Sequence, residues 1–326
     1  MIKRIIGVDL GGTQIRAVAA DLNGKIVNRK ATLTLASEGP DAVIERIQEQ
    51  ILLAADGEPF DAIGIGAPGP TDPFAGLVLM GPNLPGWDHT PLRDLLADRF
   101  DVPVFLGNDA NLAGLAEHHY GAGRGVAHMI YITVSTGIGG GVIVNNRLLL
   151  GHRGLAGEIG HITLDIQAEH QAPGVVGTLE GMASGPNIAR RAQRALVSGV
   201  PSSVLERVGN DILAVTPKLL KEEADKGDAF SVEQFRIAGR YLGIGVTSLL
   251  HVFNPQRIVI GGSIWTHCHA YMTDAMWAVI RTRCTSHAYW EDLSIVTAEL
   301  GDDVGLLGAV ALAIDGLDGH VDIYGG

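Results

Sequence analysis

One arrangement of strands and turns occurs twice in this chain of 326 residues. In the first copy, a strand leads through DLGGT (9–13) into a second strand, and Asn23-Gly24 is typical of a tight hairpin. The second copy begins near residue 126, with STGIGGG (135–141) as its turn and Asn145-Asn146 at its hairpin. This repeat predicts an α/β fold with duplicated mixed sheets flanked by helices, the glycine-rich turns facing each other across a cleft.

The rest of the chain supplies the elements that two such sheets need. Apolar side chains recur at intervals of three and four in residues 41–55, which predicts a helix. Further helices are predicted at 91–100, 111–119, 187–199, 230–253 and 305–314, and further strands at 61–70, 102–110, 257–262 and 294–300. We therefore expect two lobes: a smaller one of residues 1–120 plus a C-terminal helix at about 303–326, and a larger one of residues 121–302.

The composition limits the partners of the chain. Its formal net charge of −12 would repel nucleic acids and anionic membranes, so neither is expected, and any phosphate must be bound by local geometry. No apolar run reaches the roughly 20 residues that span a membrane. Two cysteines are too few for a disulfide framework, and the first strand begins too early for a signal peptide. A cytoplasmic location is expected.

Three other patterns are weighed and set aside. GIGAPG (64–69) matches a dinucleotide fingerprint, but Pro68 and Pro70 prevent the helix that such a site needs. The P-loop pattern does not occur in the sequence. His267, Cys268 and His269 are consecutive at the start of a predicted helix and would point in different directions, which disfavours a metal site.

Two polar segments at strand ends suit phosphate chemistry. In DLGGT, Asp9 can orient a cation through its water shell, and the glycines let backbone N–H groups approach phosphate oxygens; the alternative is an ordinary hairpin turn. Asn108 and Asp109 lie where a strand gives way to a helix. They are either helix-capping residues or, for Asp109, a carboxylate able to accept a proton during phosphoryl transfer.

Five motifs, in order along the chain, resemble those of the ROK family (repressors, open reading frames and sugar kinases) in the actin-like ATPase superfamily. This superfamily has a two-lobed, ribonuclease H-like fold. The resemblance covers nearly the whole chain. The motifs are DLGGT (9–13) and TVSTGIGGG (133–141) for phosphate, PNLPGW (82–87) and GLAGEIGH (154–161) for sugar, and IVIGGS (258–263) for adenosine.

The resemblance implies a hexose kinase that uses ATP and Mg²⁺, with Asp109 accepting the proton of the sugar 6-hydroxyl. Catalysis would consist of positioning and charge neutralisation, without a covalent enzyme intermediate. Asp9 would hold Mg²⁺ through water. The implied sugar-binding residues are Asn83, Asn108, Asp109, Glu158, His161 and Glu180, and the implied nucleotide-binding residues are Asp9, Gly11, Gly12, Thr13, Thr136, Gly137, Gly261 and Gly262.

Several alternatives stay open. GEIGH (157–161) favours a glucokinase, but a kinase for N-acetylglucosamine or N-acetylmannosamine fits nearly as well, and polyphosphate could replace ATP as donor. A sugar-responsive repressor of the same family would carry a winged helix before the first strand, which here begins by residue 4. A catalytically silent sugar sensor is a third alternative, and it is less attractive because Asp9, Thr13 and Asp109 are intact. A homodimer or a dimer of dimers is the family expectation.

The segment from His161 to Glu180 lacks the zinc ligands that most family members carry. In the family a histidine and three cysteines bind a structural zinc ion, and here the cysteine positions hold Gln171, Pro173 and Thr178. One imidazole, even with His170 nearby, cannot make a closed tetrahedral site, so no zinc is expected. Pro173 and the apolar pair Val175-Val176 are the candidates for ordering this loop instead.

Overall fold

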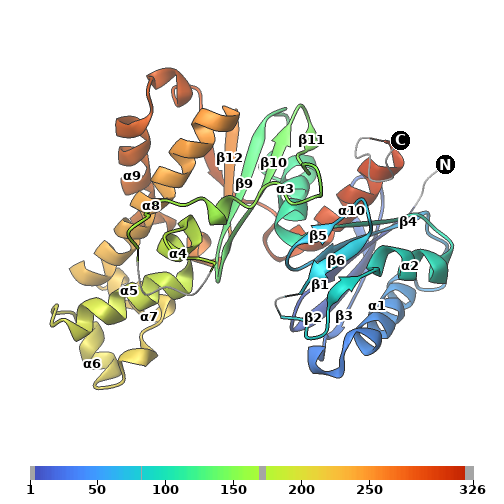
Figure 1. Cartoon of the computed structure of the whole chain (residues 1–326), viewed down its shortest axis with the longest axis horizontal. Helices are drawn as coiled ribbons and strands as arrows, with labels where there is room; N and C mark the ends of the chain where they lie inside the picture. The colour runs from blue at the N-terminus through green and yellow to red at the C-terminus, as the bar shows by residue number, and fades with distance from the viewer. Residues whose placement is uncertain (1–3, 82, 169–173, 320–326) are drawn as a thin grey trace. The chain divides into compact units, whose positions relative to one another are not determined.

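The computed structural model describes residues 4–81, 83–168 and 174–319 of the chain (Figure 1). These residues form two compact units. Unit 1 comprises the described parts of Met1–Tyr131, Gly141–Gly157 and Ala298–Gly326, and unit 2 comprises those of Ile132–Gly140 and Glu158–Thr297. The division therefore crosses the β hairpin of residues 129–144. It differs from the boundaries expected at residues 120 and 302. The expected boundary followed the sequence repeat, whereas the base of the hairpin packs with unit 1, where a Cβ on Gly114 would lie 3.1 Å from the Cα of Gly141.

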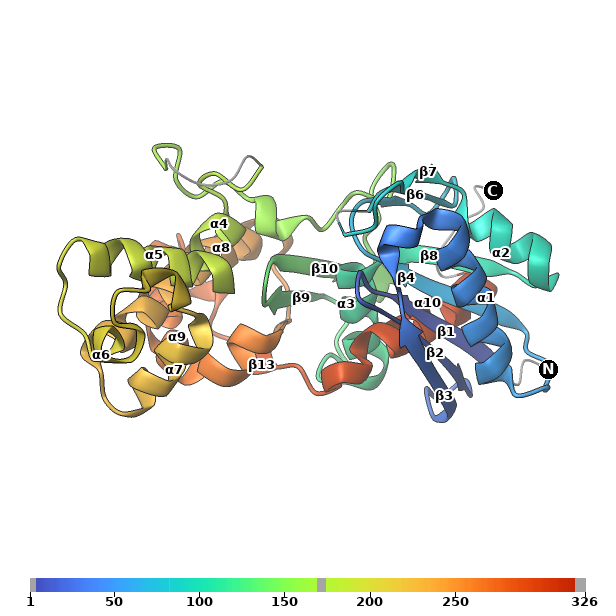
Figure 2. The same ribbon diagram turned by 90° about the horizontal axis from the view of Figure 1, so that it is seen from below.

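Unit 1 is built on a five-stranded mixed sheet. Its strand order is β3 (Ile26–Leu33), β2 (Gln14–Ala20), β1 (Ile5–Leu10), β4 (Ala62–Ala67) and β8 (Val104–Asn108). The first three strands form the predicted antiparallel meander, and β1, β4 and β8 are parallel. Helices α1 (Pro40–Ala55) and α2 (Leu92–Phe100) pack on one face in a continuous apolar core (Figure 2). The parallel strands place their carboxyl ends at one edge of this sheet.

The other face of this sheet is covered by α10 (Val304–Leu317), which packs beside α3 (Asp109–Tyr120). Two glycines let α10 approach closely. A Cβ on Gly64 would lie 1.8 Å from the carbonyl oxygen of Ala309, and one on Gly7 would lie 2.7 Å from that of Leu306. No side chain fits at either position, so the first turns of α10 lie directly on β1 and β4.

A small antiparallel sheet follows β4 and was not predicted. It consists of β5 (Thr71–Asp72), β6 (Leu77–Met80) and β7 (Asp88–Thr90). The residues after β4 thus form another strand, β5, where a dinucleotide-binding site would need a helix. The rejection of such a helix after residue 69 is confirmed. Strands of two to four residues carry too little alternation to be recognised from sequence.

A second five-stranded sheet repeats the order of the first. It runs β11 (Arg147–Leu148), β10 (Ile138–Val144), β9 (Met129–Val134), β12 (Arg257–Gly261) and β13 (Ser294–Thr297). Asn145 and Asn146 both have positive φ, at 52° and 61°, as a two-residue hairpin of type I′ requires. The predicted duplicated α/β fold is confirmed.

Most helices of unit 2 pack against the long helix α8 (Ala229–Phe253) (Figure 1). α9 (Ser263–Arg283) packs along it, and the other helices are α4 (Leu179–Ala183), α5 (Gly185–Val197), α6 (Val204–Val208) and α7 (Pro217–Asp225). Single 3₁₀ turns occur at Ala36–Glu38, Ile159–His161, Ile212–Ala214, His287–Tyr289 and Gly301–Asp303. Among the described residues, none of the helices has the length and apolar character needed to span a membrane.

Candidate functional site

In unit 1 the predicted polar residues gather at the carboxyl edge of the parallel strands. Asp9 at the end of β1 is in register with Gly66 of β4, and the next residue of β4, Ala67, is in register with Asn108 of β8. Asp109 follows immediately as the first residue of α3. In open α/β sheets this edge is where ligands bind.

The Asp9 carboxylate has a partner that sequence reasoning missed. The antiparallel register of β1 and β2 sets Arg16 directly opposite Asp9, and the Arg16 Nε donates a hydrogen bond to Asp9 Oδ2 at 3.0 Å. Arg16 Nη2 donates to the same oxygen and forms an ion pair with it. The two side chains are largely buried, at 16% exposure for Asp9 and 27% for Arg16. Once DLGGT and the following strand are read as a hairpin, counting residues across it would have identified this pair.

The turn after β1 is tightly held. Its Gly11 N–H donates to the Gln14 carbonyl at 2.9 Å, and the Gly11 carbonyl accepts from the Thr34 hydroxyl at 2.6 Å. A Cβ on Gly12 would lie 2.7 Å from the Cβ of Asn83, so a predicted phosphate residue and a predicted sugar residue are neighbours here. Thr13 is exposed beside them. The turn therefore offers bare backbone and a hydroxyl group at the edge of the sheet, as a phosphate site requires.

Asn108 and Asp109 play different local roles. Asn108 is the N-cap of α3: its side-chain oxygen accepts from the N–H groups of Ala110 and Asn111, and its amide nitrogen donates to the Gly69 carbonyl at 2.9 Å. The capping interpretation of Asn108 is thus observed, and its contact with a sugar stays a prediction. Asp109 is exposed, and its Oδ1 accepts from the N–H of Ala110 at 2.7 Å.

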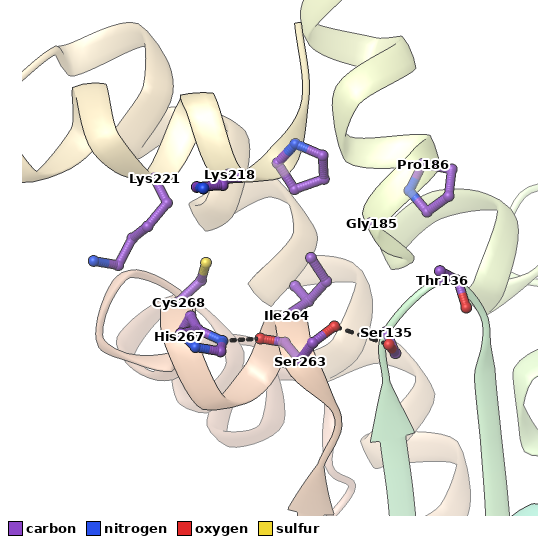
Figure 3. Close-up of a pocket in the computed structure, with 11 residues that line it drawn as sticks. Ser135, Thr136, Gly185, Pro186, Lys218, Lys221, Ser263, Ile264, His267 and Cys268 are labelled. Atoms are coloured by element: carbon purple, nitrogen blue, oxygen red, sulfur yellow. Dashed lines mark hydrogen bonds between the residues drawn. The ribbon is translucent and has the colours of Figure 1, made fainter. Parts of the chain in front are cut away.

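Unit 2 contains a pocket of about 480 Å³ beside the turn between β9 and β10 (Figure 3). The turn contributes Ser135 and Thr136, and the first turns of α5 and α9 contribute further wall residues. The Ser135 and Ser263 hydroxyls are hydrogen-bonded at 2.8 Å, and the Ser135 carbonyl accepts from the Gly185 N–H at 2.8 Å. The lining residues are Ser135, Thr136, Gly185, Pro186, Pro217, Lys218, Lys221, Ser263, Ile264, His267 and Cys268.

The charge of this pocket suits an anion. The N-termini of α5 and α9 lie at its wall, where the helix dipoles favour negative charge. Lys221 is paired with Asp225, at 2.6 and 2.8 Å, whereas Lys218 makes no ion pair within the described part of the chain. Proline and isoleucine side chains supply apolar walls, so the pocket combines apolar surface with positive charge.

His267, Cys268 and His269, which the sequence analysis rejected as a metal site, lie in the first two turns of α9. The Nδ1 atoms of His267 and His269 lie 2.7 and 3.1 Å from the carbonyls of Ser263 and Trp265, one helical turn earlier. Burial raises the pKa of the Cys268 thiol to about 11, which keeps it neutral at physiological pH. Within the described ranges, no three His, Cys, Asp or Glu side chains are grouped as a metal site would require. His267 and Cys268 instead line the pocket.

Glu180 connects the loop predicted to bind sugar with the turn of unit 2 predicted to bind phosphate. It lies in the first turn of α4, and its Oε2 accepts from the backbone N–H of Ile138 at 2.8 Å. A Cβ on Gly137 would lie 2.6 Å from the same oxygen, so the glycine makes room for the carboxylate. Sequence reasoning assigned Glu180 to the sugar and Gly137 to the nucleotide, and it did not foresee that they touch. Gly262, with φ 87°, has a similar constraint, because a Cβ there would lie 2.5 Å from the Val134 carbonyl.

Glu158 and His161 lie on the loop that precedes α4. Glu158 precedes the single 3₁₀ turn Ile159–His161, and His161 is its last residue. Their side chains are 51% and 48% exposed, and Glu158 Oε2 is 3.9 Å from His161 Nε2. His161 Nδ1 lies 3.2 Å from the Gly174 carbonyl, which ties the two ends of the loop together. Both residues are therefore accessible to a polar ligand.

The residues present do not fit a structural zinc ion. Thr178, at a family cysteine position, is the N-cap of α4: its hydroxyl accepts from the Gly181 N–H at 3.1 Å and donates to the Val175 carbonyl at 2.9 Å. Gln171 and Pro173 lie outside the described residues. Backbone hydrogen bonds hold the loop, from Leu164 and Asp165 to the Gly177 carbonyl and from Leu179 to the Ile162 carbonyl. The expected packing role of Val176 is not observed, because this side chain is 43% exposed.

Metal analysis of purified, tag-free protein is expected to find no stoichiometric zinc, and chelators should leave the melting temperature unchanged. Thr178→Ala should lower the free energy of unfolding by about 1 kcal/mol, the usual cost of losing a threonine N-cap. Denaturant unfolding measures that cost, with Thr163→Ala, an exposed threonine on the same loop, as the control. One zinc ion per chain would contradict the prediction.

The structure thus distributes the predicted residues between two sites. The first, in unit 1, brings together Asp9, Gly11, Gly12, Thr13, Asn83, Asn108 and Asp109 at one sheet edge. The others all lie in unit 2, where Thr136 lines the pocket and Gly137 and Glu180 are in contact: Thr136, Gly137, Glu158, His161, Glu180, Gly261 and Gly262. Arg16, Lys218 and Lys221 were missed. The two lysines reach the pocket through contacts distant in sequence, whereas Arg16 could have been found from the register of the hairpin.

Comparison with known proteins places these sites in context. The sequence model of the ROK family matches residues 5–316. A glucokinase of Thermotoga maritima is 34% identical over 97% of this chain and 99% of its own. A ROK hexokinase of Thermus thermophilus is 35% identical with a TM-score of 0.83, over 97% of this chain and 99% of its own. A glucokinase of Streptomyces griseus, solved with glucose and AMPPNP, is 31% identical with a TM-score of 0.78, over 96% of this chain and 99% of its own. Xylose repressors are also relatives, at 29–31% identity, and the chain covers 77–78% of their length.

Proposed function

The chain belongs to the ROK family, and on that premise we propose that it transfers the γ-phosphoryl group of ATP to the 6-hydroxyl of a hexose, glucose being the favoured substrate. The observation that carries the proposal is the pocket of unit 2. It places a glycine-rich turn, two helix N-termini and Lys218, which makes no ion pair among the described residues, beside apolar walls. This combination suits a triphosphate attached to a flat base. The Streptomyces griseus relative binds glucose and an ATP analogue with the same fold.

Asp109 supplies the acid–base chemistry of the proposed reaction. Its exposed carboxylate accepts the proton of the sugar 6-hydroxyl while the oxygen attacks the γ-phosphorus, and the bond from that phosphorus to the β–γ bridging oxygen breaks. The products are the hexose 6-phosphate and ADP. Asn83, Glu158, His161 and Glu180 would bind the remaining hydroxyls, since polar side chains at such a site reject sugars whose hydroxyls do not match.

Asp9 fits the Mg²⁺ that accompanies the nucleotide. Its Oδ2 is engaged by Arg16, while its Oδ1 has no hydrogen-bond partner among the described residues. A carboxylate oxygen with one side open is suited to the water shell of a hard cation that dehydrates reluctantly. When bound, Mg²⁺ would neutralise charge that develops on the phosphate oxygens. In the neighbouring turn the Gly11 N–H is taken by the Gln14 carbonyl, so the Gly12 N–H would be the glycine donor offered to the same phosphates.

A coupled assay for ADP release tests the proposal. Purified protein is supplied with ATP and Mg²⁺ and, in turn, glucose, mannose, N-acetylglucosamine and N-acetylmannosamine, with polyphosphate replacing ATP in a parallel series. We expect the highest kcat/KM with glucose and ATP. A higher value for an N-acetylated sugar would reassign the substrate. No turnover with any sugar, together with sugar-sensitive binding to DNA, would favour the repressor function of the xylose repressors. A cytoplasmic location and assembly as a homodimer or dimer of dimers stay predictions.

A further inference from the structure

The contact between Arg16 and Asp9 is asymmetric. Both Arg16 Nε and Arg16 Nη2 donate to Asp9 Oδ2, and within the described residues no hydrogen bond reaches Asp9 Oδ1. A side-by-side arginine–carboxylate pair would instead occupy both oxygens. The arginine therefore fixes the carboxylate through one oxygen and leaves the other accessible.

Arg16 is itself held by the segment that begins α10. Its Nη1 donates to the carbonyl of Asp302 at 2.9 Å, within the 3₁₀ turn Gly301–Asp303. Arg29 of β3 pairs with Asp303 in the same turn at 2.7 Å. Three of the five N–H donors of Arg16 are thus engaged by the protein.

The start of α10 also limits where the Asp9 carboxylate can lie. A Cβ on Gly305 would be 3.1 Å from Asp9 Cγ and 3.2 Å from each carboxylate oxygen. The carboxylate is therefore confined between Arg16 on one side and the first turn of α10 on the other. Holding an acid in one orientation before the ligand arrives removes an ordering cost from binding.

We propose that Arg16 is a positioning residue for the proposed phosphoryl transfer: it fixes Asp9 through Oδ2 so that Oδ1 faces the water shell of the nucleotide-bound Mg²⁺. This inference rests on the proposed function. Arg16 acts through Asp9 and touches neither substrate nor phosphate. Loss of Arg16 frees the carboxylate to rotate, and the requirement for Mg²⁺ rises.

The experiment uses the full chain and three variants. Arg16→Met removes the hydrogen bonds with the stem largely kept, Arg16→Lys keeps the charge, and Arg29→Met removes the other arginine that holds Gly301–Asp303 without touching Asp9. A fluorescent, non-hydrolysable ATP analogue is titrated without hexose at a series of Mg²⁺ concentrations. Melting temperatures are measured alongside, with kcat and KM for the Mg²⁺–ATP complex.

For Arg16→Met we expect the Mg²⁺ concentration at half-maximal nucleotide binding to rise about tenfold, in line with the loss of charge-assisted hydrogen bonds to a carboxylate. Arg16→Lys should show an intermediate rise of about threefold, and Arg29→Met no rise, although both arginine-to-methionine variants lower the melting temperature. If Arg16→Met fails to fold, the shift in Arg16→Lys decides.

Two outcomes would count against these ideas, and they are distinguishable. If the wild-type chain shows no Mg²⁺-dependent nucleotide binding, the proposed function fails. If the wild-type chain binds as expected but the Arg16 variants match Arg29→Met in their Mg²⁺ dependence, then Arg16 is only a structural tie to α10 and the positioning role is refuted.

Discussion

Asp109→Asn is expected to lower kcat for hexose phosphorylation by about 10³-fold, while the dissociation constant for the hexose changes by no more than about threefold. General-base catalysis contributes roughly 10²–10⁴-fold in enzymes, and an amide cannot accept the hydroxyl proton. Hydrogen bonding to the sugar survives, because asparagine keeps an acceptor oxygen and a similar shape.

The structure indicates that this substitution leaves the fold intact. Asp109 is exposed at the first position of α3, where its Oδ1 accepts from the Ala110 N–H at 2.7 Å. An asparagine oxygen can make the same bond, and Asn108 remains as the N-cap. The melting temperature should therefore change little, since the interaction of the first-turn acid with the helix dipole is modest.

Asp98→Asn is the matched control, since Asp98 is an exposed acid on α2 of the same unit and has no proposed role. Steady-state kinetics give kcat, and calorimetric titration with the hexose gives its dissociation constant. Turnover by Asp109→Asn at a level near that of Asp98→Asn would show that another group accepts the proton.

The duplicated fold was predictable because its signals are local. Alternating apolar residues in β1 and β2, the Asn23-Gly24 and Asn145-Asn146 hairpins, and the glycine-rich turns each specify structure within a few residues. Hydrophobic spacing likewise identified α1, and its predicted span of 41–55 agrees with the observed Pro40–Ala55 to one residue. These features depend on neighbouring residues, which a single sequence displays directly.

The contacts within the sites were less predictable because they join distant segments. Glu180 meets Ile138 across 42 positions, and Arg16 meets Asp302 across 286. Lys218 reaches the unit 2 pocket only because α7 packs near the start of α9, which nothing in the local sequence of α7 reveals. Motifs therefore predicted where ligands should bind, while the residues that hold the motifs in place could be identified only in the folded chain.

In the loop from His161 to Glu180, a helix-capping threonine stands where most family members have a zinc-binding cysteine. A cysteine at position 178 would serve a metal, whereas the threonine found there satisfies the N-terminus of α4 and the Val175 carbonyl. Glu180 is two residues farther on, in the first turn of that helix. The cap thus holds the first turn of α4, and with it a proposed sugar-binding carboxylate.

Two substitutions of Glu180 should separate its two contacts. Glu180→Ala removes the acceptor of the Ile138 N–H and the proposed contact with a sugar hydroxyl. Each lost hydrogen bond to a charged group costs about 1.5–3 kcal/mol, so the KM for hexose should rise by roughly 10–100-fold. The KM for ATP should rise as well, by about fivefold, because the turn of Ser135–Gly137 loses the bond that holds its end.

Glu180→Gln should affect the hexose more than the nucleotide. A glutamine oxygen can still accept from the Ile138 N–H, so the KM for ATP should stay within about twofold of wild type, while the neutral amide binds a sugar hydroxyl less strongly than a carboxylate does. Steady-state kinetics with each substrate varied, and Glu206→Ala on exposed α6 as the control, measure the difference. Equal ATP effects in the alanine and glutamine variants would mean that the bond to Ile138 does not support the phosphate turn. An unchanged hexose KM in both would remove Glu180 from the sugar site, leaving it a residue that only shapes the turn.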